Sequence, residues 1–293
     1  MKFEGSFVAL ATPFRKDLSL DEEALRRIIR LQLKAGTSGL VPCGSTGEAA
    51  TLTHEEYRRT IEITLQESQG NIPVVAGVSA NATWKAVELA REAESLGADA
   101  LLVLAPYYNK PTQEGLFRHF CEVARSTRLP VVVYNIPGRT AVNILPKTLA
   151  RMARACPNIA AVKEASGSLD QASEILTLLP GSFGVLSGDD SLTLPMMAAG
   201  AKGVVSVIAN IAPRETAQLC SAALSGNLKK ARELHLRMFP LVKALFIETN
   251  PIPVKAALRM LGLCGELPRL PLTPLEPKSK AALRSQLKRF AAL

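Results

Sequence analysis

Residues 130–163 read PVVVYNIPGRTAVNILPKTLARMARACPNIAAVK, and this stretch decides the fold. It begins with an apolar run at 130–134, continues with a helical pattern at 146–155 and ends on a second apolar run at 159–162. Both runs are apolar throughout and do not alternate, as is typical of parallel strands that are buried on both faces. The stretch therefore predicts a strand, a helix and a second strand of one parallel sheet.

The same alternation of an apolar run and an amphipathic segment repeats eight times along the chain. We expect strands at 6–11, 39–42, 74–78, 100–104, 130–134, 159–162, 183–186 and 204–207. Each is followed by a helix, at 21–35, 54–67, 83–96, 113–126, 146–155, 169–179, 191–199 and 213–224. Eight such units predict a closed (β/α)8 TIM barrel. A doubly wound open sheet is the second interpretation, and it is disfavoured because no strand leads into a glycine-rich dinucleotide motif or a P-loop.

The strand pattern ends after residue 224. Helices are expected at 229–239, 253–261 and 277–290, with proline-rich joints between them. The sequence thus predicts a catalytic barrel at 1–224 and a C-terminal helical appendage at 225–293. The net charge of +9 follows this division, since residues 1–224 hold 22 basic and 22 acidic side chains, whereas 225–293 hold 13 and 4.

Composition excludes several classes of protein. The longest stretch without Asp, Glu, Lys or Arg covers 68–84 and contains several polar residues, so no membrane span is expected. Five dispersed cysteines without a C-x-x-C pair indicate a reducing, cytoplasmic compartment, and three distant histidines give no metal signature. Nucleic-acid binding through 225–293 is an alternative, but that segment has no stacking platform or recognised motif, which favours a solvated basic face.

One lysine stands where barrel enzymes carry their active sites, at the carboxyl end of a strand. Lys163 directly follows the apolar run 159–162. Burial disfavours the charged ammonium and so favours the neutral amine, which can attack a carbonyl carbon. The alternative is a lysine whose head reaches out to solvent at the strand end.

Three neighbouring features strengthen the catalytic interpretation. Tyr134 ends the adjacent strand, where its phenol could carry protons or simply cap the core. The turn 44–47 offers backbone N–H groups and the hydroxyls of Ser45 and Thr46, which suit a carboxylate or an oxyanion. Arg139 could grip a second carboxylate with two hydrogen bonds, or could be a surface arginine. Together these groups suit Schiff-base chemistry on a 2-oxo acid.

Several motifs then become recognisable along nearly the whole chain: GSTGE at 44–48, APYYNKPTQEGL at 105–116, YNIPGRT at 134–140, VKEASG at 162–167, SGDD at 187–190 and NPIPVK at 250–255. With them the sequence resembles the dihydrodipicolinate synthase family, in the pyruvate-dependent class I aldolase superfamily that includes N-acetylneuraminate lyase. The resemblance implies a lyase without cofactor or metal. It would condense pyruvate with aspartate 4-semialdehyde to 4-hydroxy-tetrahydrodipicolinate, on the route to diaminopimelate and lysine.

The resemblance also implies a role for each site residue. Lys163 would form the imine with pyruvate, and Tyr134 would relay protons. The hydroxyl of Thr46, with that of Ser45 beside it, would link Tyr134 to Tyr108. In this family the last tyrosine reaches in from a neighbouring subunit, which implies at least a dimer and usually a homotetramer.

The remaining implied roles concern binding. Arg139 would hold the carboxylate of the aldehyde, and the backbone at Ser45 and Thr46 would hold the carboxylate of pyruvate. Gly188 and Val205 would line the pocket. A sibling aldolase that acts on sugar-derived 2-oxo acids remains the alternative, and Arg139 argues against it because a polyhydroxylated chain has less use for a fixed cation.

The sequence departs from the family pattern at two places. Ser45 stands where the synthases usually carry a threonine, and this keeps the hydroxyl while it removes a methyl group. Tyr57 and Lys85 stand where lysine-inhibited members carry a histidine and a glutamate. Because Lys85 would repel the effector's amine, weak inhibition by L-lysine is expected. Cys43, beside the turn, is expected to be a small buried hydrophobic residue.

Overall fold

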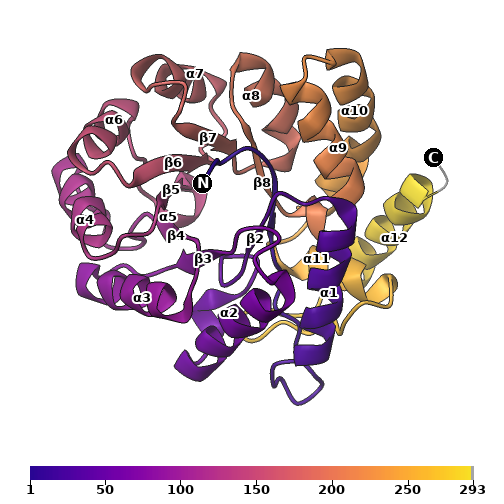
Figure 1. Cartoon of the computed structure of the whole chain (residues 1–293). Helices are drawn as coiled ribbons and strands as arrows, with labels where there is room; N and C mark the ends of the chain where they lie inside the picture. The colour runs from indigo at the N-terminus through magenta and orange to yellow at the C-terminus, as the bar shows by residue number, and fades with distance from the viewer. Residues whose placement is uncertain (292–293) are drawn as a thin grey trace.

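The computed structural model describes residues 1–291 and contains the predicted barrel (Figure 1). Eight strands pair in parallel in the order β2-β1-β8-β7-β6-β5-β4-β3. The ends of this order meet where Leu40 bridges Val74 and where the N–H of Gly77 donates to the carbonyl of Pro42 at 3.0 Å. The strands are β1 (Gly5–Ala9), β2 (Gly39–Val41), β3 (Val75–Val78), β4 (Ala100–Leu104), β5 (Val131–Asn135), β6 (Ile159–Glu164), β7 (Gly184–Ser187) and β8 (Gly203–Ser206).

A helix follows each strand, as the sequence predicts. The helices of the ring are α1 (Glu22–Ala35), α2 (His54–Ser68), α3 (Thr83–Leu96), α4 (Gln113–Arg125), α6 (Pro146–Ala155), α7 (Leu169–Leu178), α8 (Thr193–Ala199) and α9 (Pro213–Leu224). Helix α1 shows the expected end signals, because Asp21 accepts the N–H of Ala24 and Gly36 ends the helix in the left-handed conformation.

Three short helical segments lie outside the prediction: η1 (Ala49–Thr51), α5 (Pro137–Thr140) and η3 (Ile208–Asn210). The helix predicted at 191–199 is divided into η2 (Asp190–Leu192) and α8. Segments of one turn cannot display a helical period of hydrophobic residues, so the sequence pattern gives no signal for them. These three segments and η2 all follow the carboxyl end of a strand, the same end of the barrel at which the candidate site residues lie.

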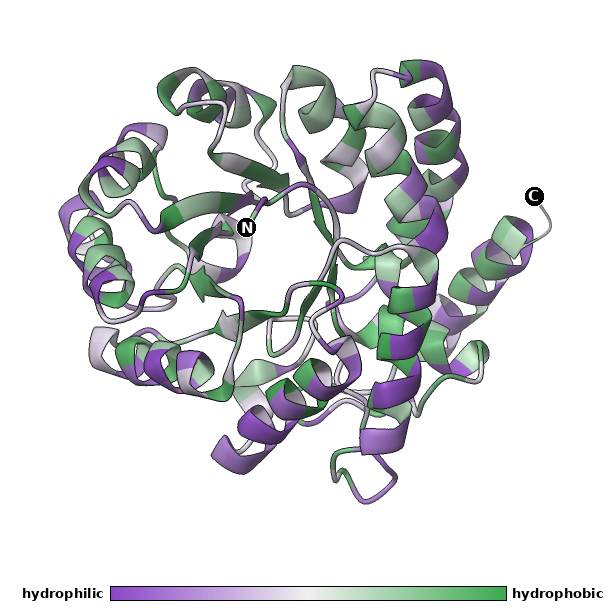
Figure 2. Cartoon of the chain, in the orientation of Figure 1, coloured by the Kyte–Doolittle hydropathy of each residue, from purple (hydrophilic) through white to green (hydrophobic). Residues whose placement is uncertain are grey.

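The continuous apolar strands serve two hydrophobic layers. In β5, Val132 and Tyr134 point into the barrel, where they pack with Phe7 and Leu102, while Val133 belongs to the layer between the strands and the helices. Successive side chains of a strand alternate between its faces, so both faces must be apolar. Figure 2 shows the matching arrangement in the outer ring, where the helices are apolar toward the strands and polar outside.

The C-terminal region contains α10 (Leu228–Ala244), α11 (Ile252–Met260) and α12 (Pro277–Ala291). Helix α12 lies outside the ring of barrel helices, beside α10 and α11 (Figure 1). One apolar cluster joins this region to the barrel through Val204 and Val207 on one side and Met238 and Leu283 on the other. The division at residue 224 stays a prediction, and residues 292–293 of the appendage lie outside the described part of the chain.

Helix α10 extends five residues beyond its predicted end at 239 and passes through Pro240. Proline removes one backbone hydrogen bond. Burial of Leu241 and Val242 in the cluster beyond it favours the longer helix. None of the helices described in residues 1–291 has the length and apolar character needed to cross a membrane.

Candidate active site

The structure brings Lys163 and Tyr134 together at the carboxyl ends of β6 and β5. The two residues are register partners in the parallel pair. The Nζ atom of Lys163 lies 4.1 Å from the centre of the Tyr134 ring, and both residues are 5% exposed. No carboxylate of residues 1–291 lies within 4.0 Å of this Nζ atom. The amine is therefore buried against a phenol and has no ion-pair partner in the described chain.

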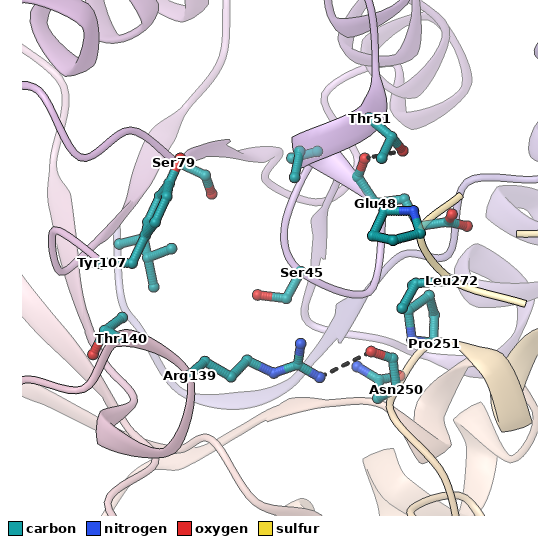
Figure 3. Close-up of a pocket in the computed structure, with 14 residues that line it drawn as sticks. Ser45, Glu48, Thr51, Ser79, Tyr107, Arg139, Thr140, Asn250, Pro251 and Leu272 are labelled. Carbon is teal, nitrogen blue, oxygen red and sulfur yellow. Dashed lines mark hydrogen bonds between the residues drawn. The ribbon is translucent and has the colours of Figure 1, made fainter. Parts of the chain in front are cut away.

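A cavity of about 330 Å³ lies at this end of the barrel, and neither Lys163 nor Tyr134 is among the residues that line it. Its lining includes Leu104, the register partner of Tyr134 on β4, so the cavity reaches the same level of the barrel as Lys163. Ser45 and Arg139, two predicted site residues, line it together with Tyr107 (Figure 3). The volume suits small metabolites of a few carbon atoms.

The turn after β2 presents one of its two hydroxyls to the cavity. Ser45 lines the cavity and its side chain points into it (Figure 3). Thr46 is 3% exposed, and its Oγ1 atom accepts a hydrogen bond of 2.9 Å from Nδ2 of Asn250. Gly47 favours the close approach of the turn to β1, because a Cβ atom there would lie 3.1 Å from the backbone oxygen of Leu10. Ser45 is therefore the hydroxyl that a molecule in the cavity meets.

Cys43, which precedes the turn, is wholly buried in the hydrophobic core. Burial raises the pKa of its thiol far above the usual range. The expectation of a small buried hydrophobic residue is confirmed.

Arg139 lies on α5 at the mouth of the cavity. Its Nη2 atom donates a hydrogen bond of 2.8 Å to the backbone carbonyl of Asn250 (Figure 3). The arginine is exposed, so the rest of its guanidinium group remains available to an anion.

The two tyrosines of the loop after β4 differ in position. Tyr107 is 36% exposed and lines the cavity, whereas Tyr108 is 87% exposed and does not line it. Tyr108 also adopts the left-handed backbone conformation, with φ of 73°. Such a conformation is uncommon for a bulky residue. Of the two tyrosines, Tyr108 is therefore the one whose side chain faces solvent.

Two further predicted residues lie around the barrel mouth without lining the cavity. Val205 is buried in the barrel interior in the same cluster as Tyr134. Gly188 donates its N–H to the carbonyl of Glu164 at 2.7 Å. A Cβ atom at Gly188 would lie 2.4 Å from that of Ala165, so only glycine fits there.

Two carboxylates that interact with the charge of Lys163 follow β7. Burial raises the pKa of Asp189 and of Asp190, and the charge of Lys163 opposes the rise in each case. Asp190 accepts the backbone N–H groups of Val207 and Ile208 at 3.0 and 2.9 Å, which fixes it to the end of β8. In residues 1–291 no group of three or more His, Cys, Asp or Glu side chains is arranged to hold a metal ion.

A second buried lysine escaped the sequence analysis. Lys255 on α11 is 0% exposed, and its Nζ atom forms an ion pair with Oε1 of Glu48. The other carboxylate oxygen of Glu48 accepts the backbone N–H of Arg269 at 3.0 Å. Burial lowers the pKa of Lys255, and the charge of Glu48 opposes this effect. The sequence did contain an indication that Lys255 is buried, because it is the only charged residue in the apolar run IPVKAAL at 252–258.

Asn250 is the other residue missed by sequence reasoning. It contacts both Thr46 and Arg139 and lines the cavity together with Pro251. The C-terminal region thus supplies one wall of the cavity. The NPIPVK motif contains Asn250, but an asparagine outside the strand ends carried no chemical signal of its own.

This fold, with its cavity at the carboxyl ends of the strands, defines the class of barrel enzymes to which the protein belongs. Residues 2–290 match the model of the dihydrodipicolinate synthetase family. The chain therefore belongs to that family, and the resemblance noted from its motifs is confirmed.

Known relatives cover the full length of the chain. It is 52% identical to a 4-hydroxy-tetrahydrodipicolinate synthase of Pelobacter propionicus, over 99% of this chain and 100% of the relative. Among solved structures, dihydrodipicolinate synthase from Aquifex aeolicus matches with a TM-score of 0.97 and 50% identity, over 99% of this chain and 98% of that one. A dihydrodipicolinate synthase variant characterised as the first monomeric one matches with a TM-score of 0.97 and 44% identity, over 99% and 98%.

Proposed function

We propose that this enzyme condenses pyruvate with L-aspartate 4-semialdehyde to give 4-hydroxy-tetrahydrodipicolinate and water. The observation that carries the proposal is the buried, ion-pair-free amine of Lys163 against Tyr134, at the level of a cavity that holds Ser45 and Arg139. Full-length relatives at about half identity carry the name of this activity. The reaction is a step of diaminopimelate and lysine synthesis.

The first half of the reaction prepares a carbon nucleophile. The neutral amine of Lys163 attacks the ketone carbon of pyruvate, and loss of water leaves a protonated imine. Loss of a proton from the methyl carbon then gives an enamine. Tyr134 moves these protons in our proposal, and the contact of its ring with the Lys163 amine supports this role. The turn at Ser45 and Thr46 holds the pyruvate carboxylate, with the Ser45 hydroxyl facing it.

The second half forms the carbon–carbon bond and releases the lysine. The enamine carbon attacks the aldehyde carbon, whose oxygen becomes a hydroxyl. The amino group of the former aldehyde substrate then attacks the imine carbon, closes the ring and expels the Lys163 amine. Arg139 binds the carboxylate of the aldehyde substrate at the cavity mouth, while its bond to Asn250 fixes its orientation. Gly188 and Val205 shape the pocket around these reactants.

We also infer that Tyr108 completes the site of a second copy of the chain. Its phenol is 87% exposed and does not line the cavity of its own chain. A relay from Tyr134 through the turn hydroxyls to the partner's Tyr108 therefore needs at least a dimer, and we propose a homotetramer. Sedimentation equilibrium tests the assembly. A monomer with full activity would remove Tyr108 from the relay.

The cytoplasm is the compartment we propose for this assembly. All five cysteines are buried and unpaired in the described chain. Free thiols in this number are typical of proteins in a reducing compartment. Export to an oxidising compartment with full activity would argue against this location.

The direct test of the proposed chemistry is reductive trapping. Incubation with pyruvate and borohydride should add one reduced pyruvyl group to Lys163, identified by mass spectrometry of peptides. Aspartate 4-semialdehyde, added before borohydride, should decrease the adduct because it consumes the enamine. An adduct on another lysine, or none, would overturn the mechanism. Turnover of sugar-derived 2-oxo acids in place of the semialdehyde would instead support the sibling aldolase.

A further inference from the structure

Glu164 directly follows Lys163 on β6, and the alternation of side chains places it on the opposite face of the sheet. It is 3% exposed. Its carboxylate accepts hydrogen bonds from Nδ2 of Asn135 at 3.0 and 3.3 Å, from the N–H of Ser166 at 2.6 Å and from Nε2 of Gln171 at 3.0 Å. In residues 1–291 it has no lysine, arginine or histidine partner within 4.0 Å. It is a buried anion that only amide groups solvate.

These amides belong to a closed network. Oδ1 of Asn143 accepts from Asn135 at 2.8 Å and from Gln171 at 3.1 Å, and Asn143 donates back to Gln171 at 2.7 Å. The remaining acceptor of Asn135 is used by the N–H of Ile144 at 3.0 Å. One carboxylate thus connects four parts of the chain: the ends of β5 and β6, the start of α7 and the segment at 143–144.

The network supports the backbone that carries the candidate site. Tyr134 precedes Asn135 and Lys163 precedes Glu164, and the β5–β6 register pairs each residue with its counterpart. A change in the Glu164 contacts therefore moves the two strand ends on which the amine and the phenol stand.

The charge of Glu164 is a second, separable contribution. A buried carboxylate is costly to ionise unless other groups compensate it. The ionisable groups around this point are Lys163 on the same strand, Tyr134 on β5, and Asp189 and Asp190 after β7, while Asp170 on α7 and Lys147 on α6 are exposed. Lys163 is therefore the one buried cation among several acids in this part of the described chain.

We propose that Glu164 is a positioning residue for the reaction: its hydrogen bonds fix Lys163 against Tyr134, and its charge stabilises the positive charge of the protonated imine. This inference rests on the proposed function of Lys163. An anion on the next residue, even on the other face of the strand, also favours the protonated form of the free amine. Its removal should therefore have two effects, a slower reaction and an amine that is neutral at lower pH.

The test compares Glu164→Gln with wild type in the pH dependence of imine trapping by pyruvate and borohydride. In Glu164→Gln the maximal rate of imine trapping should fall about tenfold or more. The acidic limb of its pH profile, where the rate rises as the amine loses its proton, should move to lower pH by about half a unit or more. A purely structural role lowers the rate and leaves the limb in place. The matched control is Gln171→Met, which breaks one bond to Glu164 but keeps the charge and should leave the limb unmoved.

Two further variants keep the test decisive. Glu164→Asp keeps the charge and should keep the limb of the wild type. If Glu164→Gln does not fold, the exchanged pair Glu164→Gln/Gln171→Glu retains one carboxylate and one amide across the same contact. It should move the limb in the same direction by a smaller amount. An unmoved limb in Glu164→Gln, or in the exchanged pair if Glu164→Gln does not fold, would overturn the inference. An absent adduct in wild type would overturn the proposed function instead.

Discussion

The chain buries two lysines that both contact an aromatic ring but differ in whether they form an ion pair. Lys163 and Lys255 each place Nζ 4.1 Å from the centre of an aromatic ring, that of Tyr134 and that of Phe14. Lys255 is paired with the carboxylate of Glu48, whereas Lys163 has no such partner in residues 1–291. A direct ion pair stabilises an ammonium relative to the free amine. The paired lysine is therefore suited to holding segments together, and the unpaired one to nucleophilic attack.

Removal of the unpaired amine should have the largest effect on activity. Lys163→Met should lower kcat by about 10³-fold or more, because no other group can form the imine. Trapping with pyruvate and borohydride should then give no adduct. Lys147→Met, at an exposed lysine of α6, is the control and should react like wild type. A persistent adduct in Lys163→Met would break the comparison, since another lysine would then be the nucleophile.

Removal of the paired amine should mainly affect stability. Lys255→Met leaves Glu48 buried without its cation and should lower the free energy of unfolding by about 3–5 kcal/mol, measured in urea. The double variant Lys255→Met/Glu48→Gln removes both charges and should recover most of this loss. A loss below about 1 kcal/mol in Lys255→Met would mean that Arg269 alone satisfies Glu48.

The pH dependence of Glu48→Gln should sharpen the comparison further. Burial lowers the pKa of Lys255, and without Glu48 it should fall further. Between the lowered pKa of Lys255 in the folded variant and its ordinary pKa of 10.5 in the unfolded chain, only the unfolded chain holds the proton. The stability of the variant therefore rises with pH in this window. The deficit relative to wild type should shrink by up to about 1.4 kcal/mol per pH unit as the pH rises toward 10.

The control for this titration is Lys255→Met, which removes the titrating group and should show no such recovery. Urea unfolding at several pH values between 7 and 10 provides the measurement. A deficit of Glu48→Gln that is constant over this range would show that Lys255 keeps its proton without the carboxylate.

The two lysines also mark what the sequence can and cannot predict. Lys163 ends a strand, and the barrel fold places strand ends at the active site, so one pattern predicts both its position and its neighbour Tyr134. Lys255 and Asn250 come from the C-terminal region, about two hundred positions from Glu48 and Thr46 in the chain. No local periodicity reports such a contact, so the Lys255–Glu48 pair and the wall of the cavity at Asn250 became visible only in the fold.

A similar limit applies to the two hydroxyls of the turn. Ser45 and Thr46 are neighbours, and their chemistry is alike, so the sequence alone cannot assign one to the cavity. The contact of Thr46 with Asn250 distinguishes them. The short helices after the strands escape prediction for the reason already given, while the long helices and the buried strands follow from hydrophobic spacing.

The smallest effect is expected from a third ammonium, that of free L-lysine. If the amine of free L-lysine binds in a buried site, it needs a carboxylate partner, as the amine of Lys255 does. At the position where inhibited members carry a glutamate, this chain presents Lys85, exposed on α3. Tyr57 is buried, and its hydroxyl donates to the carbonyl of Gly77 at 3.1 Å, so it supplies no carboxylate to an effector. L-lysine at about 1 mM should lower the initial rate less than about twofold.

The variant Lys85→Glu restores an acid at that position and is the matched comparison, with the initial rate again measured against L-lysine concentration. Its inhibition should exceed that of wild type, because the exchange replaces a repulsion of the effector's amine by an attraction. Half-inhibition of the wild-type enzyme well below 1 mM would contradict the rule that an ammonium here needs a carboxylate. It would mean that other groups, such as backbone carbonyls, solvate the effector's amine. The contrast between a paired and an unpaired lysine would then apply only to the enzyme's own buried side chains.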